Sequence, residues 1–164
     1  MAIHSLKMVQ NIPAGIETIW ELFSNPGNLA KLTMPGLGLR IISGGDHSII
    51  YPGQRIEYKL KPVWGITVHW ITEIKEVERL KFFMDIQRKG PYRVWEHRHF
   101  FKEIDGGVEM TDMVQYKNPL GILGNMANSI LVKKRLKQIF EYRFQQVEQV
   151  FGKWEDQQPL IHFS

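Results

Sequence analysis

The chain has 164 residues, the length of one domain with a single hydrophobic core, and its 43% hydrophobic and 23% charged residues argue against disorder. It contains no cysteine, which excludes disulfides, thiolate nucleophiles, zinc ribbons and iron–sulfur clusters, and which fits a reducing, cytoplasmic compartment. The net charge of +4 comes from basic residues that are mostly scattered among acidic ones, so no nucleic-acid partner is expected.

The N-terminal part of the chain predicts one strand followed by two short helices. Its first residues lack the features of an export signal, and no stretch approaches about 18 unbroken apolar residues, so stable membrane insertion is not expected. Loose alternation over residues 3–12 predicts a strand that Pro13 ends. Apolar residues three and four positions apart over 13–24 predict an amphipathic helix, and a second short helical segment ends at Pro35 and Gly36.

From residue 39 the apolar pattern changes to a period of two, which predicts a series of strands joined by short turns. Ile56, Tyr58 and Leu60 alternate with charged residues, as in an antiparallel sheet that has one face exposed to water. The predicted strands are 39–43, 53–60, 64–74, 80–87, 92–104 and 108–116.

Pro119 is predicted to open a long amphipathic helix that runs to about Phe151. At roughly 30 residues this helix would be about 45 Å long. A basic cluster at residues 133–137 is interpreted as a solvated face of the helix, with a weak site for anionic lipid or phosphate as the alternative. Residues 153–164 show no period, so we interpret 1–152 as a single domain and 153–164 as a C-terminal extension.

These elements predict an α+β fold in which a seven-stranded, curved antiparallel sheet wraps around the long C-terminal helix, with two short helices after the first strand. A sheet with one apolar face needs a cover, and the long helix is the one predicted element large enough to provide it. One helix cannot fill the whole concave side of such a sheet. The sequence therefore predicts a cavity between sheet and helix, a place where apolar ligands bind.

The order of elements matches the helix-grip fold, and the sequence resembles the superfamily that contains START domains, the major birch pollen allergen and aromatic polyketide cyclases (SRPBCC). The segment RKGPYRVWEHRHFFKEIDGGVEMTDMVQYKNPLG is most similar to a bacterial branch of this superfamily, and PGLG at 35–38 and Trp70 also fit. The resemblance covers nearly the whole chain. It implies the helix-grip fold, while the activities of the superfamily range from carriers to cyclases.

His97 and His99 lie on one face of the predicted strand 92–104, and the hairpin that follows determines what faces them. If Asp105 and Gly106 form a two-residue loop, residue 104 pairs with 107, and His99 then lies opposite Asp112. A three-residue loop would instead place residues 111 and 113 beside the histidines. The family resemblance favours the pairing with Asp112.

Three interpretations of the two histidines remain open. With Asp112 they could form a metal site of two histidines and one carboxylate, although we predict no metal and no cofactor. Either histidine, held by Asp112, could act as a general base in a cyclase or dehydratase. The favoured interpretation is that a hydrogen bond to Asp112 holds the cavity wall in shape and presents a polar contact to a ligand.

We therefore predict a protein that binds a small hydrophobic molecule (lipid, isoprenoid, polyketide or aromatic) between the sheet and the C-terminal helix. The alternative is a cyclase or dehydratase that uses His97 or His99 with Asp112. The directions of Asp85, Gln87 and His69 stay open, as does the oligomeric state. The predicted ligand-binding residues are Tyr58, Trp70, Trp95, His97, His99, Asp112, Tyr116, Leu123, Met126, Ala127 and Ile130.

Overall fold

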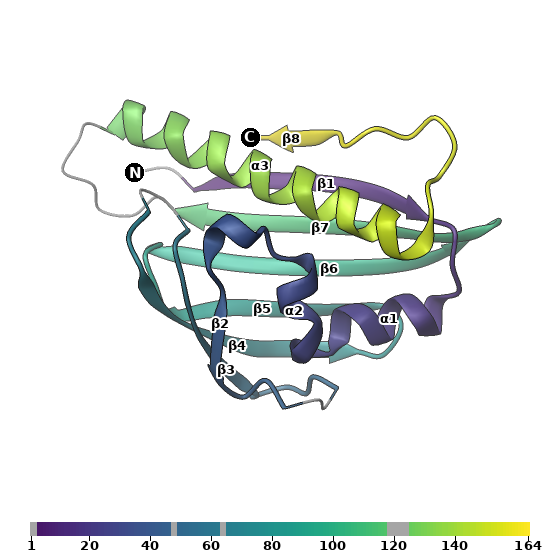
Figure 1. The fold of residues 1–164 in the computed structure, drawn as a ribbon, viewed down its shortest axis with the longest axis horizontal. Coiled ribbons are helices and arrows are strands. Elements are labelled where there is room, and N and C mark those ends of the chain that lie inside the picture. The colour runs from purple at the N-terminus through teal and green to yellow at the C-terminus, as the bar shows by residue number, and fades with distance from the viewer. Residues whose placement is uncertain (1–2, 47–48, 63–64, 118–124) are drawn as a thin grey trace.

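The computed structural model describes residues 3–46, 49–62, 65–117 and 125–164, and for residues 125–128 it describes the backbone alone. A long helix and the short helices lie against one face of a curved sheet (Figure 1). In chain order the elements are β1 (His4–Ile12), α1 (Ile16–Ser24), η1 (Pro26–Asn28), α2 (Leu29–Leu32), η2 (Pro35–Leu37), β2 (Arg40–Ser43), β3 (Arg55–Leu60), β4 (Val68–Glu78), β5 (Phe82–Lys89), β6 (Val94–Ile104), β7 (Gly107–Lys117), α3 (Asn125–Phe151) and β8 (Ile161–Phe163).

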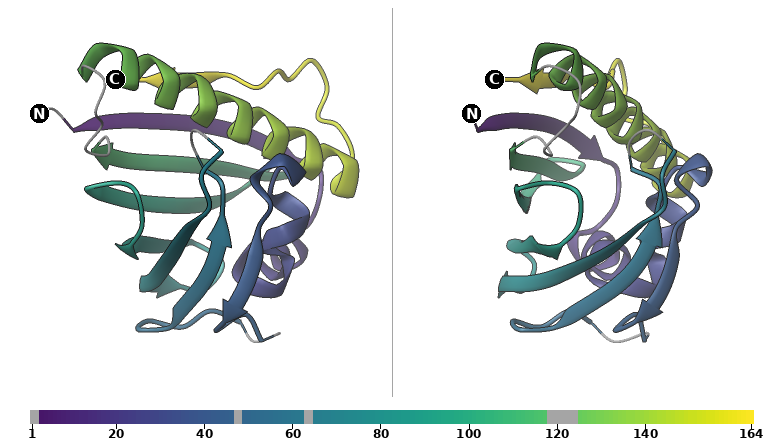
Figure 2. Two further views of the ribbon diagram at one scale, coloured as in Figure 1. Left: turned by 60° about the vertical axis from the view of Figure 1, so that its left-hand side comes forward. Right: turned by 90° about the vertical axis from the view of Figure 1, so that its left-hand side faces the viewer.

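The described strands form one antiparallel sheet in the order β2-β3-β4-β5-β6-β7-β1-β8. Irregularities in the register interrupt the pairing of β2 with β3 and, at two places, that of β4 with β5. Such bulges bend a strand and increase its twist. They allow the sheet to curl around the helices, as the two side views show (Figure 2). The predicted fold class, an α+β helix-grip fold, is confirmed.

The hairpin between β6 and β7 has the two-residue turn that the sequence predicts. Ile104 pairs with Gly107, and His99 pairs with Asp112. The turn residue Gly106 has φ +81°, a conformation that glycine adopts without steric cost. This register brings the side chains of His97, His99 and Asp112 to the same face of the sheet.

Helix α3 covers the concave face because its apolar residues recur every three or four positions. Its fully buried side chains lie along one stripe: Val132, Leu136, Phe140, Phe144 and Val147. The stripe packs against β1 and β7, where Leu6, Met8 and Val114 are buried in the same cluster. At 27 residues the helix is about 40 Å long and spans the sheet. The predicted start of this helix at Pro119 lies outside the described residues.

A second core cluster lies under α1, at the other end of the sheet. Trp20 of α1 makes edge-to-face contacts with Phe83 and Phe101, at centroid distances of 6.0 and 5.4 Å. Ile19 is fully buried beside it. Val147 and Phe151 of α3 also pack in this cluster, so α1 and the C-terminal end of α3 together cover this end of the sheet. The site described below lies between the two clusters.

The C-terminal segment is part of the sheet, where the sequence predicted an extension without regular structure. Strand β8 pairs with β1, so the described sheet has eight strands instead of the predicted seven. The Gln157 side chain accepts a hydrogen bond from the backbone N–H of Asn11 at 2.5 Å and donates one to its carbonyl oxygen at 3.1 Å. A three-residue strand is too short to show a period, which explains why the pattern did not reveal it.

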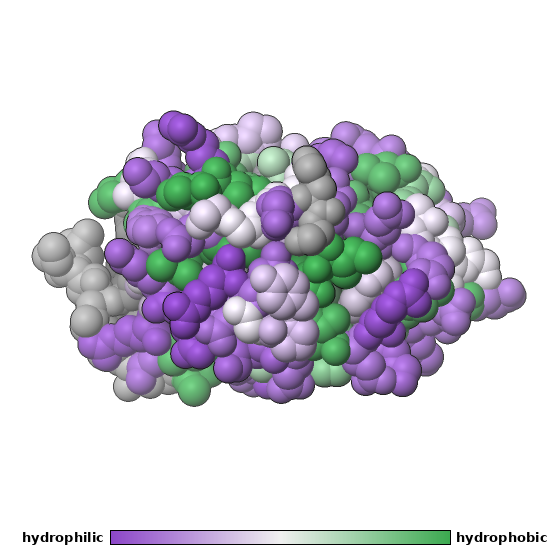
Figure 3. Space-filling model, turned by 90° about the horizontal axis from the view of Figure 1, so that it is seen from below, coloured by the Kyte–Doolittle hydropathy of each residue, from purple (hydrophilic) through white to green (hydrophobic). Residues whose placement is uncertain are grey.

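The outer surface mixes hydrophilic and apolar groups, as the view from below shows (Figure 3). Large exposed apolar side chains include Ile42, Ile49 and Ile66, the last of which is 62% exposed although it falls within the predicted strand 64–74. Ile66 precedes the first residue of β4, Val68, so the strand alternation does not apply to it. Within the described residues, no helix combines the length and apolarity that crossing a bilayer requires.

Candidate ligand-binding site

A cavity of about 200 Å³ lies between the concave face of the sheet, α3 and the short helices. Its apolar walls come from elements far apart in the chain, which the curvature of the sheet brings together. They include Leu32 of α2, Ile56 and Leu60 of β3, Ile74 of β4, and Leu136 and Phe140 of α3. The alternation that the sequence shows over Ile56, Tyr58 and Leu60 turns all three side chains toward this space.

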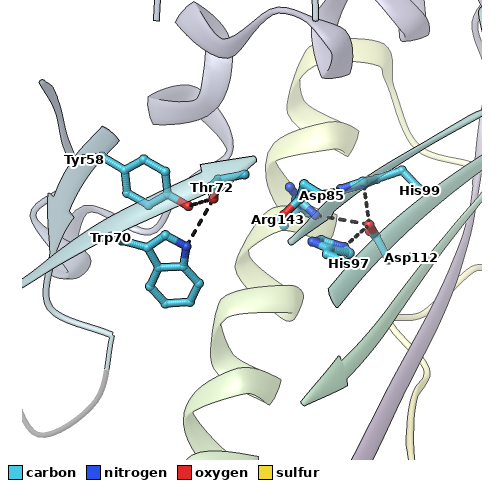
Figure 4. A network of polar contacts seen from close by, with 8 residues as sticks. All are labelled: Tyr58, Trp70, Thr72, Asp85, His97, His99, Asp112 and Arg143. Carbon is cyan, nitrogen blue, oxygen red and sulfur yellow. Dashed lines mark hydrogen bonds and ion pairs between the residues drawn. The ribbon is translucent and has the colours of Figure 1, made fainter. Parts of the chain in front are cut away.

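Aromatic rings form one side of the cavity. Trp70 meets Trp95 edge to face at 5.4 Å and lies nearly parallel to Tyr58 at 6.1 Å. Thr72 fixes two of these rings: its hydroxyl accepts a hydrogen bond from Trp70 Nε1 at 3.1 Å and shares one with the Tyr58 hydroxyl at 2.7 Å (Figure 4). Burial raises the pKa of Tyr58, so its phenol stays protonated.

A charged cluster closes another side of the cavity, and Asp112 of β7 is its centre (Figure 4). One carboxylate oxygen, Oδ1, lies 2.8 Å from His97 Nε2, 2.8 Å from His99 Nδ1 and 3.2 Å from Arg143 Nη1. His97 and Arg143 make hydrogen bonds to this oxygen, whereas the contact of His99 with it is an ion pair. Sheet and helix are thus joined by a buried ion pair.

Asp85 of β5 adds a second carboxylate on the cavity side of the cluster. It lies directly across the strand ladder from His97, and its Oδ2 is 3.4 Å from His99 Nε2. The two carboxylates therefore sit at opposite ends of the His99 ring. The imidazoles are 3.8 Å apart between centroids, and the possible ligand atoms of Asp85, His97 and His99 all lie within 4.8 Å of one another.

The environment drives the two histidines toward different protonation states. Burial, followed by the charge of His99, lowers the pKa of His97 to about 4, so His97 is neutral at neutral pH. For His99, burial opposes protonation, but the two carboxylates at the ends of its ring, Asp112 above all, outweigh burial and raise the pKa. Burial also opposes ionisation of Asp112, yet Arg143 and the two histidines hold its pKa well below the ordinary value.

The structure brings most of the predicted site residues together. Tyr58, Trp70, Trp95, His97 and His99 line the cavity. Asp112 is 2% exposed and contacts the imidazoles without being among the lining residues. Tyr116 is fully buried against Trp95 and is not a lining residue either.

The prediction that Ile130 binds the ligand is wrong, because Ile130 is 65% exposed and does not line the cavity. It precedes the buried Val132 by two positions, which is about 200° around an α-helix and turns it to the outer face. Leu123 lies outside the described residues, and so do the side chains of Met126 and Ala127.

Sequence reasoning missed Arg143 and Thr72 and left Asp85 undecided. Asp85 shares its face of β5 with Phe83, which is 5% exposed. The alternation of the strand could therefore have predicted that Asp85 points inward. Arg143 lies three positions after Phe140, within the buried stripe of α3. A charged residue at an apolar position of a helix is the pattern that could have revealed it.

Comparison with protein-family models finds no match, and no curated protein matches the sequence. Solved structures do share the fold. Protein Ms6760 from Mycobacterium smegmatis is 17% identical, with a TM-score of 0.64 over 89% of each chain. A START superfamily protein from the same organism is 15% identical, with a TM-score of 0.64 over 90% of this chain and 99% of that one. Major latex-like protein 151 from Panax ginseng is 12% identical, with a TM-score of 0.62 over 91% and 97%. The chain therefore has the START-like helix-grip fold, with a polar cluster set into an apolar cavity.

Proposed function

We propose that the chain binds a compact, largely apolar molecule in this cavity, with a polar end of the guest against His97 and Asp85. The observation that carries the proposal is the unfilled volume of about 200 Å³ between two clusters of buried apolar residues. Protein interiors are close-packed, and voids larger than a water molecule are few. Burying apolar surface in this space contributes about 25 cal/mol per Å² to binding.

The volume favours a guest of one or two rings. An empty apolar cavity of about 150 Å³ can hold benzene, and pockets for drug-sized ligands are about 300–1,000 Å³. The cavity here, at about 200 Å³, falls between these limits. Of the ligand classes that the sequence left open, small aromatics and compact polyketide-like rings suit it better than long-chain lipids.

The polar end favours a hydroxyl group on the guest. Asp112 is ionised, so His97 Nε2 donates to it and the other nitrogen of the neutral ring, Nδ1, is an acceptor. A phenol or alcohol could donate its proton to this nitrogen, while the apolar walls hold the ring. We therefore infer a phenolic or alcoholic guest.

For His97, a binding role is favoured over that of the general base of a cyclase or dehydratase. The contact between His97 and Asp112 resembles the support of a general base, but a pKa of about 4 makes His97 a weak base at neutral pH.

Titration with 2-naphthol, a two-ring phenol, tests the proposed function by calorimetry. The chain should bind about one molecule of 2-naphthol and should bind palmitate much more weakly. Ile139→Trp should abolish binding because Ile139 lines the cavity on α3. The variant should still fold, since Ile139 is only partly buried and the fold can accommodate the larger ring. Leu131→Trp, at an exposed position of the same helix, is the matched control and should bind normally. No binding of any one- or two-ring compound, or equal binding by both variants, would contradict the proposal.

A further inference from the structure

We propose that Asp85, His97 and His99 form a site for one divalent transition-metal ion of the zinc type, at the polar end of the cavity. The site rests on the proposed function and deepens it: in the metal-free chain the guest's hydroxyl meets His97 Nδ1, and when an ion occupies that nitrogen the same hydroxyl would meet the ion instead. The sequence alone had suggested Asp112 as the carboxylate of such a site, and the structure puts a different carboxylate in that position.

The sheet itself places the three ligands. His97 and His99 are two residues apart on β6 and share its inner face, and both are nearly fully buried. Asp85 is the cross-strand neighbour of His97 on β5. Their possible ligand atoms all lie within 4.8 Å of one another. Ligands on paired strands are held by the backbone hydrogen bonds of the sheet, so the side chains alone need to rotate to bring these atoms to the separation of about 3.4 Å that one tetrahedral ion requires.

The distance between His99 and Asp85 matches a shared ion better than a hydrogen bond. Nε2 and Oδ2 are 3.4 Å apart, whereas a good N–H···O bond is about 2.7–3.2 Å. Two ligand atoms that each lie about 2.1 Å from a tetrahedral ion are separated by about 3.4 Å. This separation leaves room for an ion between the two side chains.

Asp112 lies where a carboxylate that does not itself bind the ion can orient the two histidines that do. Its Oδ1 contacts Nε2 of His97 and Nδ1 of His99. The remaining nitrogens, Nδ1 of His97 and Nε2 of His99, are those available to an ion. Metal-binding histidines in proteins commonly direct their second nitrogen to such a carboxylate, which fixes the ring and the tautomer.

Arg143 is the nearby cation that could oppose the ion, but its charge is already matched. Its Nη1 lies 3.2 Å from Asp112, and its guanidinium lies over the rings of Phe23 and Phe140 at 5.8 and 5.7 Å. Asp112 thus balances Arg143, and the charge of Asp85 is left for the ion.

The ligand set indicates which ions fit. Two imidazoles and one carboxylate suit Zn²⁺, Co²⁺ or Fe²⁺, while Mg²⁺ and Ca²⁺ prefer oxygen ligands alone. Three protein ligands leave at least one position free for a water molecule or for an oxygen of the guest. That free position would face the cavity, because Asp85, His97 and His99 all line it.

The test is calorimetric titration of the untagged, chelator-treated full chain with Zn²⁺, and separately with Co²⁺, whose visible absorption reports its coordination. The expected result is one ion per chain with no comparable binding of Mg²⁺. His97→Ala, His99→Ala and Asp85→Asn should each lower the affinity at least about tenfold. His69→Ala is the matched control, because His69 pairs with Glu57 outside this cluster, and it should leave the affinity unchanged.

Absence of stoichiometric Zn²⁺ and Co²⁺ binding would overturn the metal site, as would equal losses in the His69 variant. Thermal unfolding of each variant, followed by circular dichroism, separates loss of a ligand from loss of the fold, and Asp85→Asn preserves the side-chain shape. Titration of the metal-free chain with 2-naphthol is a separate measurement. If it binds while the ions do not, the binding function stands and the metal site fails.

Discussion

At the scale of single residues, Asp112 determines the arrangement of the cavity's polar end. Its side chain is 2% exposed, and one of its oxygens contacts two histidines and Arg143. A buried ion pair of this kind contributes little compared with an apolar replacement of both partners, but removing one partner leaves a buried charge uncompensated.

We therefore predict that Asp112→Asn lowers the free energy of unfolding by about 3–5 kcal/mol, measured by urea denaturation. The amide keeps the shape of the carboxylate but cannot balance Arg143. Glu17→Gln serves as the control, since Glu17 forms an exposed pair with Arg79 and its loss should cost less than about 1 kcal/mol. Equal, small effects of the two substitutions would show that the buried charge is compensated in another way.

Glu73, on β4, gives the molecule a stabilising contact that depends on pH. Arg88 donates to it from Nε and Nη2 at 2.7 and 3.0 Å. This hydrogen-bonded pair, with further help from Lys75, lowers the pKa of Glu73 from 4.5 to about 2. A depressed carboxyl pKa stabilises the folded state fully above 4.5, and this stabilisation is lost as the pH falls from 4.5 toward 2.

Glu73→Gln should therefore lower the melting temperature at pH 7, and its difference from the parent chain should shrink progressively below pH 4.5. Differential scanning calorimetry at pH 7, 5, 4 and 3 measures this difference. A gap that stays constant over the whole range would exclude the ion pair as its cause.

At the scale of elements, the β6–β7 hairpin shows why the local sequence pattern was enough to predict so much of the site. The Asp105–Gly106 turn fixes its length, and the length fixes which residues face His97 and His99. Strand alternation likewise placed Tyr58 and Trp70 on the inner face, and both line the cavity.

The elements that sequence reasoning missed depend on contacts between distant parts of the chain. Strand β8 exists because β1 offers it an edge, not because its three residues favour a strand. Arg143 becomes part of the site only when α3 lies across β7 and meets Asp112. Ile130 was assigned to the wrong face because the apolar pattern of the helix does not by itself show which of its apolar side chains point toward the sheet.

Removing residues 153–164 should expose the edge of β1 and promote self-association. β8 now pairs with that edge, and unpaired strand edges are templates for pairing with another chain. Size-exclusion chromatography with light scattering should give a higher mass for the shortened chain than for the full one at the same concentration. Ser5 and Ser164 exchange backbone hydrogen bonds, so the alternation of an antiparallel ladder turns the N–H of His162, opposite Lys7, toward β1. Full-length His162→Pro, which keeps the tail but removes this backbone donor, should shift the mass in the same direction. Unchanged mass in both would show that the edge is protected without β8.

At the scale of the whole molecule, the core is divided into two clusters with an unfilled space between them. The residues of both clusters are buried, whereas the side chains that form the walls of the cavity lack contacts on the side that faces the cavity. A guest that fills the space supplies these contacts, so it should stabilise the entire fold.

Saturation with 2-naphthol at about 100 times its dissociation constant should raise the free energy of unfolding by about 2.7 kcal/mol. For a chain of this length, this corresponds to a rise in melting temperature of about 5–10 °C. Thermal unfolding with and without the compound measures the shift, and Ile139→Trp should show none. A rise of the same size in that variant would place the bound compound somewhere other than the cavity.

The pair of indole rings in the aromatic wall has a practical consequence. Trp70 and Trp95 both line the cavity and lie 5.4 Å apart, whereas Trp20 is buried under α1 and Trp154 lies against the turn glycines Gly106 and Gly107. A guest in the cavity changes the polarity around Trp70 and Trp95 and leaves Trp20 and Trp154, the other tryptophans that the structure describes, as they were. Occupancy can therefore be followed through the protein's own fluorescence emission, without attaching a dye to the chain.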